Sequence, residues 1–195
     1  ALVRDIRARQ SEVRGLLEEE EAPQIAAVAA SSRNDGAAAV AARLAEWLQF
    51  DLAAFRHERT VEAAFSYLRA AAERNGVFVL LMGNLGSHHS AIDPEAFRGF
   101  ALADPIAPFV VINDQDAKVA WAFTLIHELA HIAIGATGIS GGSPEVLVEA
   151  FCNEVAGEIL LPRAELELFP VAVDDAVLRK DITDFAVLRN VSRQM

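Results

Sequence analysis

The part of the sequence that decides the fold is the pentapeptide His127-Glu128-Leu129-Ala130-His131, which lies inside an apolar run of helix-forming residues. On a helix, residues four apart share a face, so both imidazole rings can point at one metal ion. Glu128 follows the first histidine directly and can reach a water molecule on that ion as a general base. Since a random shuffle of this composition gives the pattern about one time in a hundred, the surrounding sequence has to support it.

Length and composition limit the classes of protein that fit. The chain has 195 residues, of which 53% are hydrophobic, and is most simply one domain with a sizeable core. Its net charge of -11 argues against a nucleic-acid-binding surface. It has one cysteine, no apolar run long enough to span a membrane and no signal peptide, so we expect a cytoplasmic protein. Both ends look cut from a longer chain.

Hydrophobic periodicity predicts three helices in the first part of the chain. They cover residues 2–21, 37–49 and 60–74. Asp35 is the expected cap of the second helix. Thr60 is the expected cap of the third, which should end at Asn75 and Gly76.

Three short runs of β-forming residues come next, and further helices follow them. The expected strands are residues 77–82, 99–103 and 109–113. A one-turn helix is expected at residues 93–97. The later helices cover about residues 115–134, 143–162 and 173–190, the first capped by Asn113 or Asp114 and the second opened by Ser143 and Pro144. The sequence therefore predicts an α+β protein, mainly helical, with a small three-stranded sheet packed beside the HExxH helix.

A catalytic zinc site needs a third protein ligand, because it combines three protein ligands with one open position. No histidine follows His131, so a carboxylate has to serve, and the next helix offers Glu145, Glu149, Glu154 and Glu158. We choose Glu149, which lies among apolar residues, because a buried carboxylate is costly unless it is paired or bound to metal. Asn153, four residues later, would support the ligands by hydrogen bonding. The alternative, that Glu149 is a surface residue of an amphipathic helix, stays open.

Three segments together resemble the ImmA/IrrE metallo-endopeptidase family. They are Phe123-Thr124-Leu125-Ile126-His127-Glu128-Leu129-Ala130-His131, Glu149-Ala150-Phe151-Cys152-Asn153-Glu154-Val155-Ala156 and Leu160-Leu161-Pro162. By this resemblance, which implies a minimal zincin-like fold, the metal ligands are His127, His131 and Glu149, and Glu128 is the catalytic base. The ligand types suit zinc, with manganese as the alternative. The family usually has alanine where this chain has Ile126 and Cys152, and we interpret Cys152 as a small buried hydrophobe.

The resemblance also implies an organisation and partners. Members of this family often carry an Xre-type helix-turn-helix before the peptidase, or act on a repressor that has one. Residues 1–50 would then be N-terminal helices left from a linker to such a domain, residues 77–162 the catalytic core, and residues 163–195 a truncated helical segment. We expect no nucleic-acid binding by residues 1–195 and no membrane association, and the sequence leaves the oligomeric state open.

Further polar side chains are candidates for stabilising an oxyanion or supporting the site. The candidates for the oxyanion are His88, His89 and Arg98. Thr124 precedes His127 by about one helical turn and bonds either a backbone carbonyl or a group beside the site. We interpret Tyr67 as a core residue and His57 as a surface residue.

Three functional hypotheses follow from these observations. The first is a metal-dependent endopeptidase that cleaves a protein partner, such as a helix-turn-helix repressor in a stress response, with the strand at residues 99–103 aligning the substrate as an added strand. The second is a non-proteolytic regulatory module of an Xre-type transcriptional regulator that senses a metal or ligand. The third is a structural helical domain in which the HExxH pattern is accidental.

Overall fold

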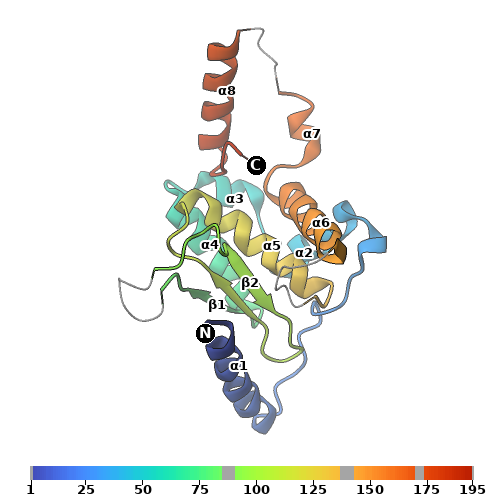
Figure 1. Cartoon of the computed structure of the whole chain (residues 1–195). Coiled ribbons are helices and arrows are strands. Elements are labelled where there is room, and N and C mark those ends of the chain that lie inside the picture. The colour runs from blue at the N-terminus through green and yellow to red at the C-terminus, as the bar shows by residue number, and fades with distance from the viewer. Residues whose placement is uncertain (1, 85–90, 137–142, 170–173, 195) are drawn as a thin grey trace.

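The helix that carries the pentapeptide, α5 (Trp121–Ala133), lies at the centre of the molecule (Figure 1). The structure is a computed structural model that describes residues 2–84, 91–136, 143–169 and 174–194. Every residue of α5 except Phe123 is buried. A helix that is apolar on all sides has to be covered on all sides, and a sheet and several helices supply that cover.

A three-stranded sheet packs against one side of α5. Its strands are β1 (Phe78–Leu81), β2 (Gly99–Leu102) and β3 (Phe109–Ile112), in the order β1-β3-β2. β3 pairs with β1 in parallel and with β2 in antiparallel orientation, with Phe100 opposite Val111. β2 is therefore an edge strand within the part of the chain that the structure describes.

Helix α1 (Leu2–Glu19) covers the other face of the sheet (Figure 1). Successive side chains of a strand point to opposite faces. In β2, Ala101 joins the core that contains α5, whereas Phe100 packs with Leu2 and Ile6 of α1. The sheet thus separates two apolar cores, a large one around α5 and a small one under α1.

Three helices close the large core. They are α2 (Ala37–Leu48), α3 (Leu52–His57) and α4 (Val61–Arg74). The Thr60 hydroxyl accepts a hydrogen bond from the Ala63 N–H at 3.1 Å and caps α4, as the sequence predicts. Gly76, with φ of 87°, ends the turn that leads from α4 into β1.

The described residues of the C-terminal third are mainly helical. Helix α6 (Ser143–Leu160) packs against both α5 and α2. The short helix α7 (Arg163–Leu166) and the helix α8 (Asp175–Val187) follow it at one end of the molecule (Figure 1). Asn190, just after α8, donates from its side-chain amide to the backbone oxygens of Phe55 and Glu58 and so ties this end of the chain to α3.

The fold class is confirmed: the protein is α+β and mainly helical, with a small three-stranded sheet beside the HExxH helix. Each strand lies within one or two residues of its predicted range. Among the described helices, none combines the length and the apolar character that a membrane crossing requires.

Several local predictions are wrong. Asp35 does not cap α2, because its carboxylate accepts from the Ser32 N–H and from Arg43, and Gly36 stands at the start of the helix instead. Residues 93–97 form a single turn rather than a helix, although Asp93 does accept from the Glu95 N–H as a cap would.

The helix with the pentapeptide also begins later than expected. Asn113 accepts from the Gln115 N–H, but this bond forms a turn, and a short 3-10 helix at Lys118–Ala120 intervenes before α5 starts at Trp121. Helices α3 and α7 were not predicted, since each is shorter than two turns. The predicted cap at Ser143 and Pro144 lies outside the described side chains.

Candidate metal centre

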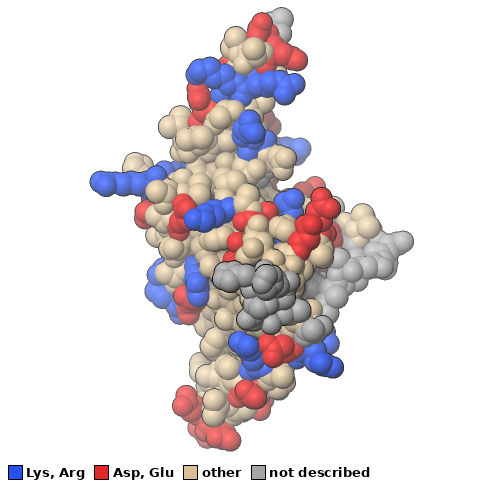
Figure 2. All heavy atoms as spheres, turned by 60° about the vertical axis from the view of Figure 1, so that its left-hand side comes forward, with Lys and Arg blue, Asp and Glu red and all other residues tan. Residues whose placement is uncertain are grey.

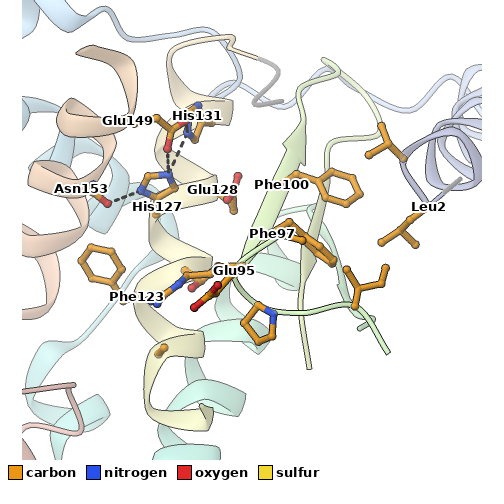
Figure 3. Close-up of a pocket in the computed structure, with 18 residues that line it drawn as sticks. Leu2, Glu95, Phe97, Phe100, Phe123, His127, Glu128, His131, Glu149 and Asn153 are labelled. Atoms are coloured by element: carbon orange, nitrogen blue, oxygen red, sulfur yellow. Dashed lines mark hydrogen bonds and ion pairs between the residues drawn. The ribbon is translucent and has the colours of Figure 1, made fainter. Parts of the chain in front are cut away.

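Three side chains converge between α5 and α6 (Figure 3). The Nε2 atoms of His127 and His131 lie 3.1 Å apart. Glu149, on α6, places one carboxylate oxygen 3.1 Å from His127 Nε2 and the other 3.2 Å from His131 Nε2. The four-residue spacing on α5 brings the two rings together, and the packing of α6 against α5 adds the carboxylate.

The spacing of these atoms fits a metal ion. Ligands about 2.0–2.1 Å from a tetrahedral ion lie about 3.3 Å from one another, close to the 3.1–3.2 Å observed here. Two neutral imidazole nitrogens this close repel each other unless a cation or a proton lies between them. Two imidazoles and one carboxylate are a donor set of catalytic zinc sites and leave a fourth position open, and manganese accepts the same ligands.

Burial favours the neutral form of both rings, which is the form that binds metal. Desolvation is the main cause that lowers the pKa of His127, while the charge of Glu149 acts in the opposite direction. The pKa of His131 is also lowered, first by desolvation and then by its neighbour His127, again against Glu149. Both rings are therefore neutral at neutral pH, and each has one nitrogen with a free lone pair that can bind a metal.

Asn153 orients the first histidine. The Nδ1–H of His127 donates to the side-chain oxygen of Asn153 at 2.9 Å, which leaves Nε2 to face Glu149 and His131. Glu149 and Asn153 are four residues apart on α6 and share the face that meets α5. The second histidine lacks such support: His131 Nδ1 is buried and has no hydrogen-bond partner among the described residues.

The other carboxylates of α6 do not join this group. Glu154 is exposed and Glu158 is half-buried, and neither belongs to the cluster of His127, His131 and Glu149 whose ligand atoms lie within 4.8 Å of one another. The side chain of Glu145 lies outside the described residues. The interpretation of Glu149 as a surface residue is not supported, because its carboxylate faces both imidazoles.

Glu128 lies beside the histidines on the wall of a cavity (Figure 3). It is only 5% exposed, and desolvation, followed by the charge of Glu149, raises its pKa to about 8. Strand β2 approaches it closely at Gly99, where an added Cβ would lie 2.6 Å from Thr124 Cγ2 and 3.1 Å from Glu128 Oε1. The carboxyl is thus held in an apolar setting with a proton affinity near neutrality, as a general base requires.

The cavity extends from the histidines to the first turn of α1 and has a volume of about 870 Å³. Its polar side is formed by α5 and α6. Its opposite side is formed by α1, β2 and the segment before β2, which contribute the apolar residues Leu2, Val3, Ile92, Phe97 and Phe100 and the charged residues Glu95 and Arg98. Leu2, Phe97 and Phe100 are labelled in Figure 3. The space is large enough for several residues of an extended peptide.

The other side chains predicted to stabilise an oxyanion or support the site do not all lie at the cavity. Thr124 and Arg98 both line the cavity, Thr124 buried and Arg98 with a side chain that is 64% exposed and 3.9 Å from Asp116. His88 and His89 lie outside the described residues. The cavity therefore brings two of these four candidates to the site.

The residues interpreted as structural are found away from the cavity. Tyr67 packs against the large core, and its hydroxyl accepts from the Asp51 N–H at 3.2 Å. His57 is exposed. Cys152 is fully buried among apolar neighbours, and desolvation raises the pKa of its thiol to about 12, so it is a packed hydrophobe at neutral pH.

The comparison with protein families bears on this geometry. A family model described as Peptidase M78, IrrE N-terminal-like domain, matches residues 72–195. The chain belongs to this family. The M78 match contains both α5 and α6, and with them every residue of the cluster. Membership of M78 confirms the resemblance found in the sequence and supports an activity of the metallopeptidase type. Comparisons with curated proteins and with solved structures gave no match.

Three features of the site were not predicted from the sequence. Gly99 was assigned to a strand without a reason for being glycine, and the contact with Glu128 supplies one. Leu2 and Val3 lie far in the sequence from the HExxH segment, which begins at Phe123, so no local pattern connects them to the cavity. Phe97 was assigned to a helix that the structure does not contain.

Proposed function

We propose that this protein is a metal-dependent endopeptidase. The observation that carries the proposal is the convergence of His127, His131 and Glu149 on one point, next to a buried carboxyl, Glu128, in a cavity. Membership of the M78 family supports the same reaction type. We propose zinc as the metal, because two imidazoles and one carboxylate match its catalytic sites, with manganese as the alternative.

The proposed roles follow from position. A bound zinc ion supplies a Lewis acid that polarises a carbonyl and makes water more acidic. Glu128 accepts a proton from the attacking water at its carboxylate and donates it to the leaving nitrogen. Asn153 keeps the His127 ring in the orientation that its hydrogen bond sets. Arg98 is the described cavity residue that we propose to face the carbonyl oxygen, with His88 and His89 as the other candidates.

We propose that the substrate is a segment of a protein in extended conformation. β2 is an edge strand beside Glu128, and an edge strand can accept a peptide as an additional strand. On the face shown in Figure 2, basic and acidic side chains are interspersed rather than gathered into a basic surface, which favours a protein partner over a nucleic acid. A helix-turn-helix repressor in the cytoplasm is the substrate that we propose from the family.

The decisive experiment separates metal binding from hydrolysis. Purified wild-type protein, Glu128→Gln and His127→Ala are analysed for bound zinc and then incubated with a co-purified helix-turn-helix repressor. We expect one equivalent of zinc in the wild type and in Glu128→Gln, and loss of zinc in His127→Ala. Cleavage should fall by about 10²–10⁴-fold in Glu128→Gln, since that variant lacks only the base.

The same experiment addresses the alternative, a regulatory module that binds metal without cleaving protein. Equal behaviour of the wild type and Glu128→Gln towards the repressor, with zinc bound in both, would contradict the peptidase and favour the regulator. Absence of both zinc and manganese from the wild type after loading with each metal would contradict both proposals.

A further inference from the structure

The side of the cavity opposite the histidines is an apolar surface built from two distant parts of the chain. Phe97 and Phe100 have ring centroids 5.9 Å apart, and Leu2 and Val3 of α1 line the same space. Leu2 and Phe100 are buried, whereas Phe97 and Val3 are half-buried and so expose part of their surface to the cavity. We refer to these four residues as the apolar wall, of which Leu2, Phe97 and Phe100 are labelled in Figure 3.

The apolar wall adjoins the edge of the sheet at β2, where no other described strand pairs. In an antiparallel pair, only every second residue directs its backbone N–H and C=O to the partner strand. The Asn113 N–H donates to the Arg98 oxygen at 2.8 Å, and this register continues at Phe100. The backbone groups of Gly99 and Ala101 therefore point to the open edge, where a peptide strand can bond to them.

The side chains of a peptide bound at this edge have fixed directions. Residues opposite one another in neighbouring strands point to the same face of the sheet. Peptide residues opposite Gly99 and Ala101 would point toward α5, the side of Glu128, whereas the residue opposite Phe100 would point toward α1. The peptide residue opposite Phe100 therefore meets the apolar wall, while its two neighbours face the side of Glu128.

We propose that the apolar wall is a specificity pocket that selects a bulky apolar side chain, such as leucine or phenylalanine, in the substrate. The proposal rests on the proposed function, because it takes the ligand to be an extended peptide beside β2. An alanine would leave part of the pocket unfilled, and a charged side chain would lose its hydration without gaining a partner from the four residues of the wall. Since one methylene in an apolar pocket changes specificity by about 10- to 200-fold, we expect at least about tenfold preference for leucine over alanine.

Binding to a catalytically silent variant tests the pocket directly. Glu128→Gln with added zinc is titrated against fluorescein-labelled decapeptides of alternating threonine and serine, with leucine, phenylalanine, alanine or aspartate at one central position. Because the rest of the peptide is uniform, each peptide can adopt the register that places the variable residue against the wall. We expect the leucine and phenylalanine peptides to bind at least about tenfold more tightly than the alanine and aspartate peptides.

Two substitutions in the wall and one control identify where the preference arises. Val3→Trp, made in the Glu128→Gln background, fills the pocket and should abolish the preference. Leu16→Trp is the matched control, since Leu16 lies on the same helix, is 62% exposed and does not line the cavity. Should Val3→Trp fail to fold in a thermal melt, Phe97→Ala enlarges the same pocket and should shift the preference from leucine to phenylalanine.

The results for the pocket and for the peptidase can be told apart. Equal affinity for all four peptides would contradict the proposed pocket. An equal loss of the binding preference in Val3→Trp and in Leu16→Trp would contradict it as well. If wild-type protein hydrolyses the peptides without preference, the pocket is wrong and the peptidase stands. If the binding preference holds but the wild type hydrolyses no peptide or protein, the pocket stands and the peptidase is wrong.

Discussion

At the scale of single residues, Asn153 gives a direct test of how the chain prepares a histidine for metal. Asn153→Ala removes the acceptor for His127 Nδ1–H, so the ring loses its fixed tautomer and orientation. Partners of this kind contribute about 10- to 100-fold to metal affinity, and we expect a loss of that size in a competition titration with a zinc chelator.

The matched control for this change is Asn153→Asp, which keeps an acceptor oxygen at the same position. It should retain most of the affinity. Unchanged zinc affinity in Asn153→Ala would mean that α5 packing alone orients the ring.

Glu128 predicts a pH dependence of stability in the metal-free protein. Folding raises the pKa of this carboxyl from 4.5 to about 8, because burial disfavours its charged form. Its protonated form therefore favours the folded state fully below about pH 4.5, and this contribution is lost as the pH rises towards 8, by an amount on the order of a few kcal/mol. Chelator-treated wild type should accordingly lose thermal stability relative to Glu128→Gln between pH 5 and pH 9.

The measurement compares the melting temperatures of the two proteins at several pH values. Because His127 and His131 titrate in both proteins, their effect cancels in the difference. A difference that stays constant from pH 5 to pH 9 would show that the carboxyl is ionised over this range in the folded protein, as it is in the unfolded chain, and so would contradict the raised pKa.

At the scale of elements, the contact between β2 and α5 depends on one glycine. In Gly99→Ala, the new Cβ would lie 2.6 Å from Thr124 Cγ2 and 3.0 Å from the Val111 oxygen, so the strand and the helix would have to move apart. Overpacking of this kind costs about 1–3 kcal/mol. We expect a lower free energy of unfolding in urea. We also expect a fall in kcat/KM that, converted to a free energy, exceeds this loss of stability, because Glu128 Oε1 lies beside the added Cβ.

The control is Gly15→Ala in α1, where nothing lies within 4 Å of the added Cβ. An alanine there should stabilise the helix by about 0.5–1 kcal/mol. Gly99→Ala with full activity and stability would contradict the close approach of β2 to α5.

The elements also show what a sequence can reveal about this fold. The β-forming runs, the Thr60 cap and the spacing of His127 and His131 are local patterns, and each predicted its element or contact. Asp35 does not cap α2, because its carboxylate accepts hydrogen bonds from the Ser32 N–H and from Arg43 instead. Residue propensities do not tell which of these partners an aspartate will bind. Helix α3 escaped prediction because it has six residues and depends on Asp51, whose carboxylate caps two backbone N–H groups.

The candidate site was predictable to the extent that its residues repeat at helical spacing. Glu149 and Asn153 could be chosen because two polar residues interrupted the apolar face of one helix, and the structure places both against α5. Gly99 and Phe97 could not be chosen, since their contacts with the site arise from how a strand and a helix meet in space.

At the scale of the whole molecule, α1 connects the small core to the cavity. The sequence predicts a single domain in which residues 1–50 form N-terminal helices outside the catalytic core of residues 77–162. In the structure Leu2 and Ile6 are buried against the sheet, and Leu2 also lines the cavity. Because both cores contain side chains of the same three strands, loss of packing on one face of the sheet should also destabilise the other face. The chain should therefore unfold as one unit rather than as a peptidase core with a detachable helix.

Ile6→Ala tests this cooperativity, because Ile6 is fully buried in the small core, whereas both tryptophans, Trp47 and Trp121, belong to the large one. Loss of a buried isoleucine side chain costs about 2–5 kcal/mol, which in a chain of this size lowers the melting temperature by roughly 5–15 °C. If the cores are coupled, tryptophan fluorescence and far-ultraviolet circular dichroism should shift together. Leu16→Ala, on the exposed side of the same helix, should leave both unchanged within about 0.5 kcal/mol. A fluorescence transition that stays in place while part of the helical signal melts earlier would show that α1 unfolds by itself, and that the cavity can lose one of its walls while the metal-binding helices remain folded.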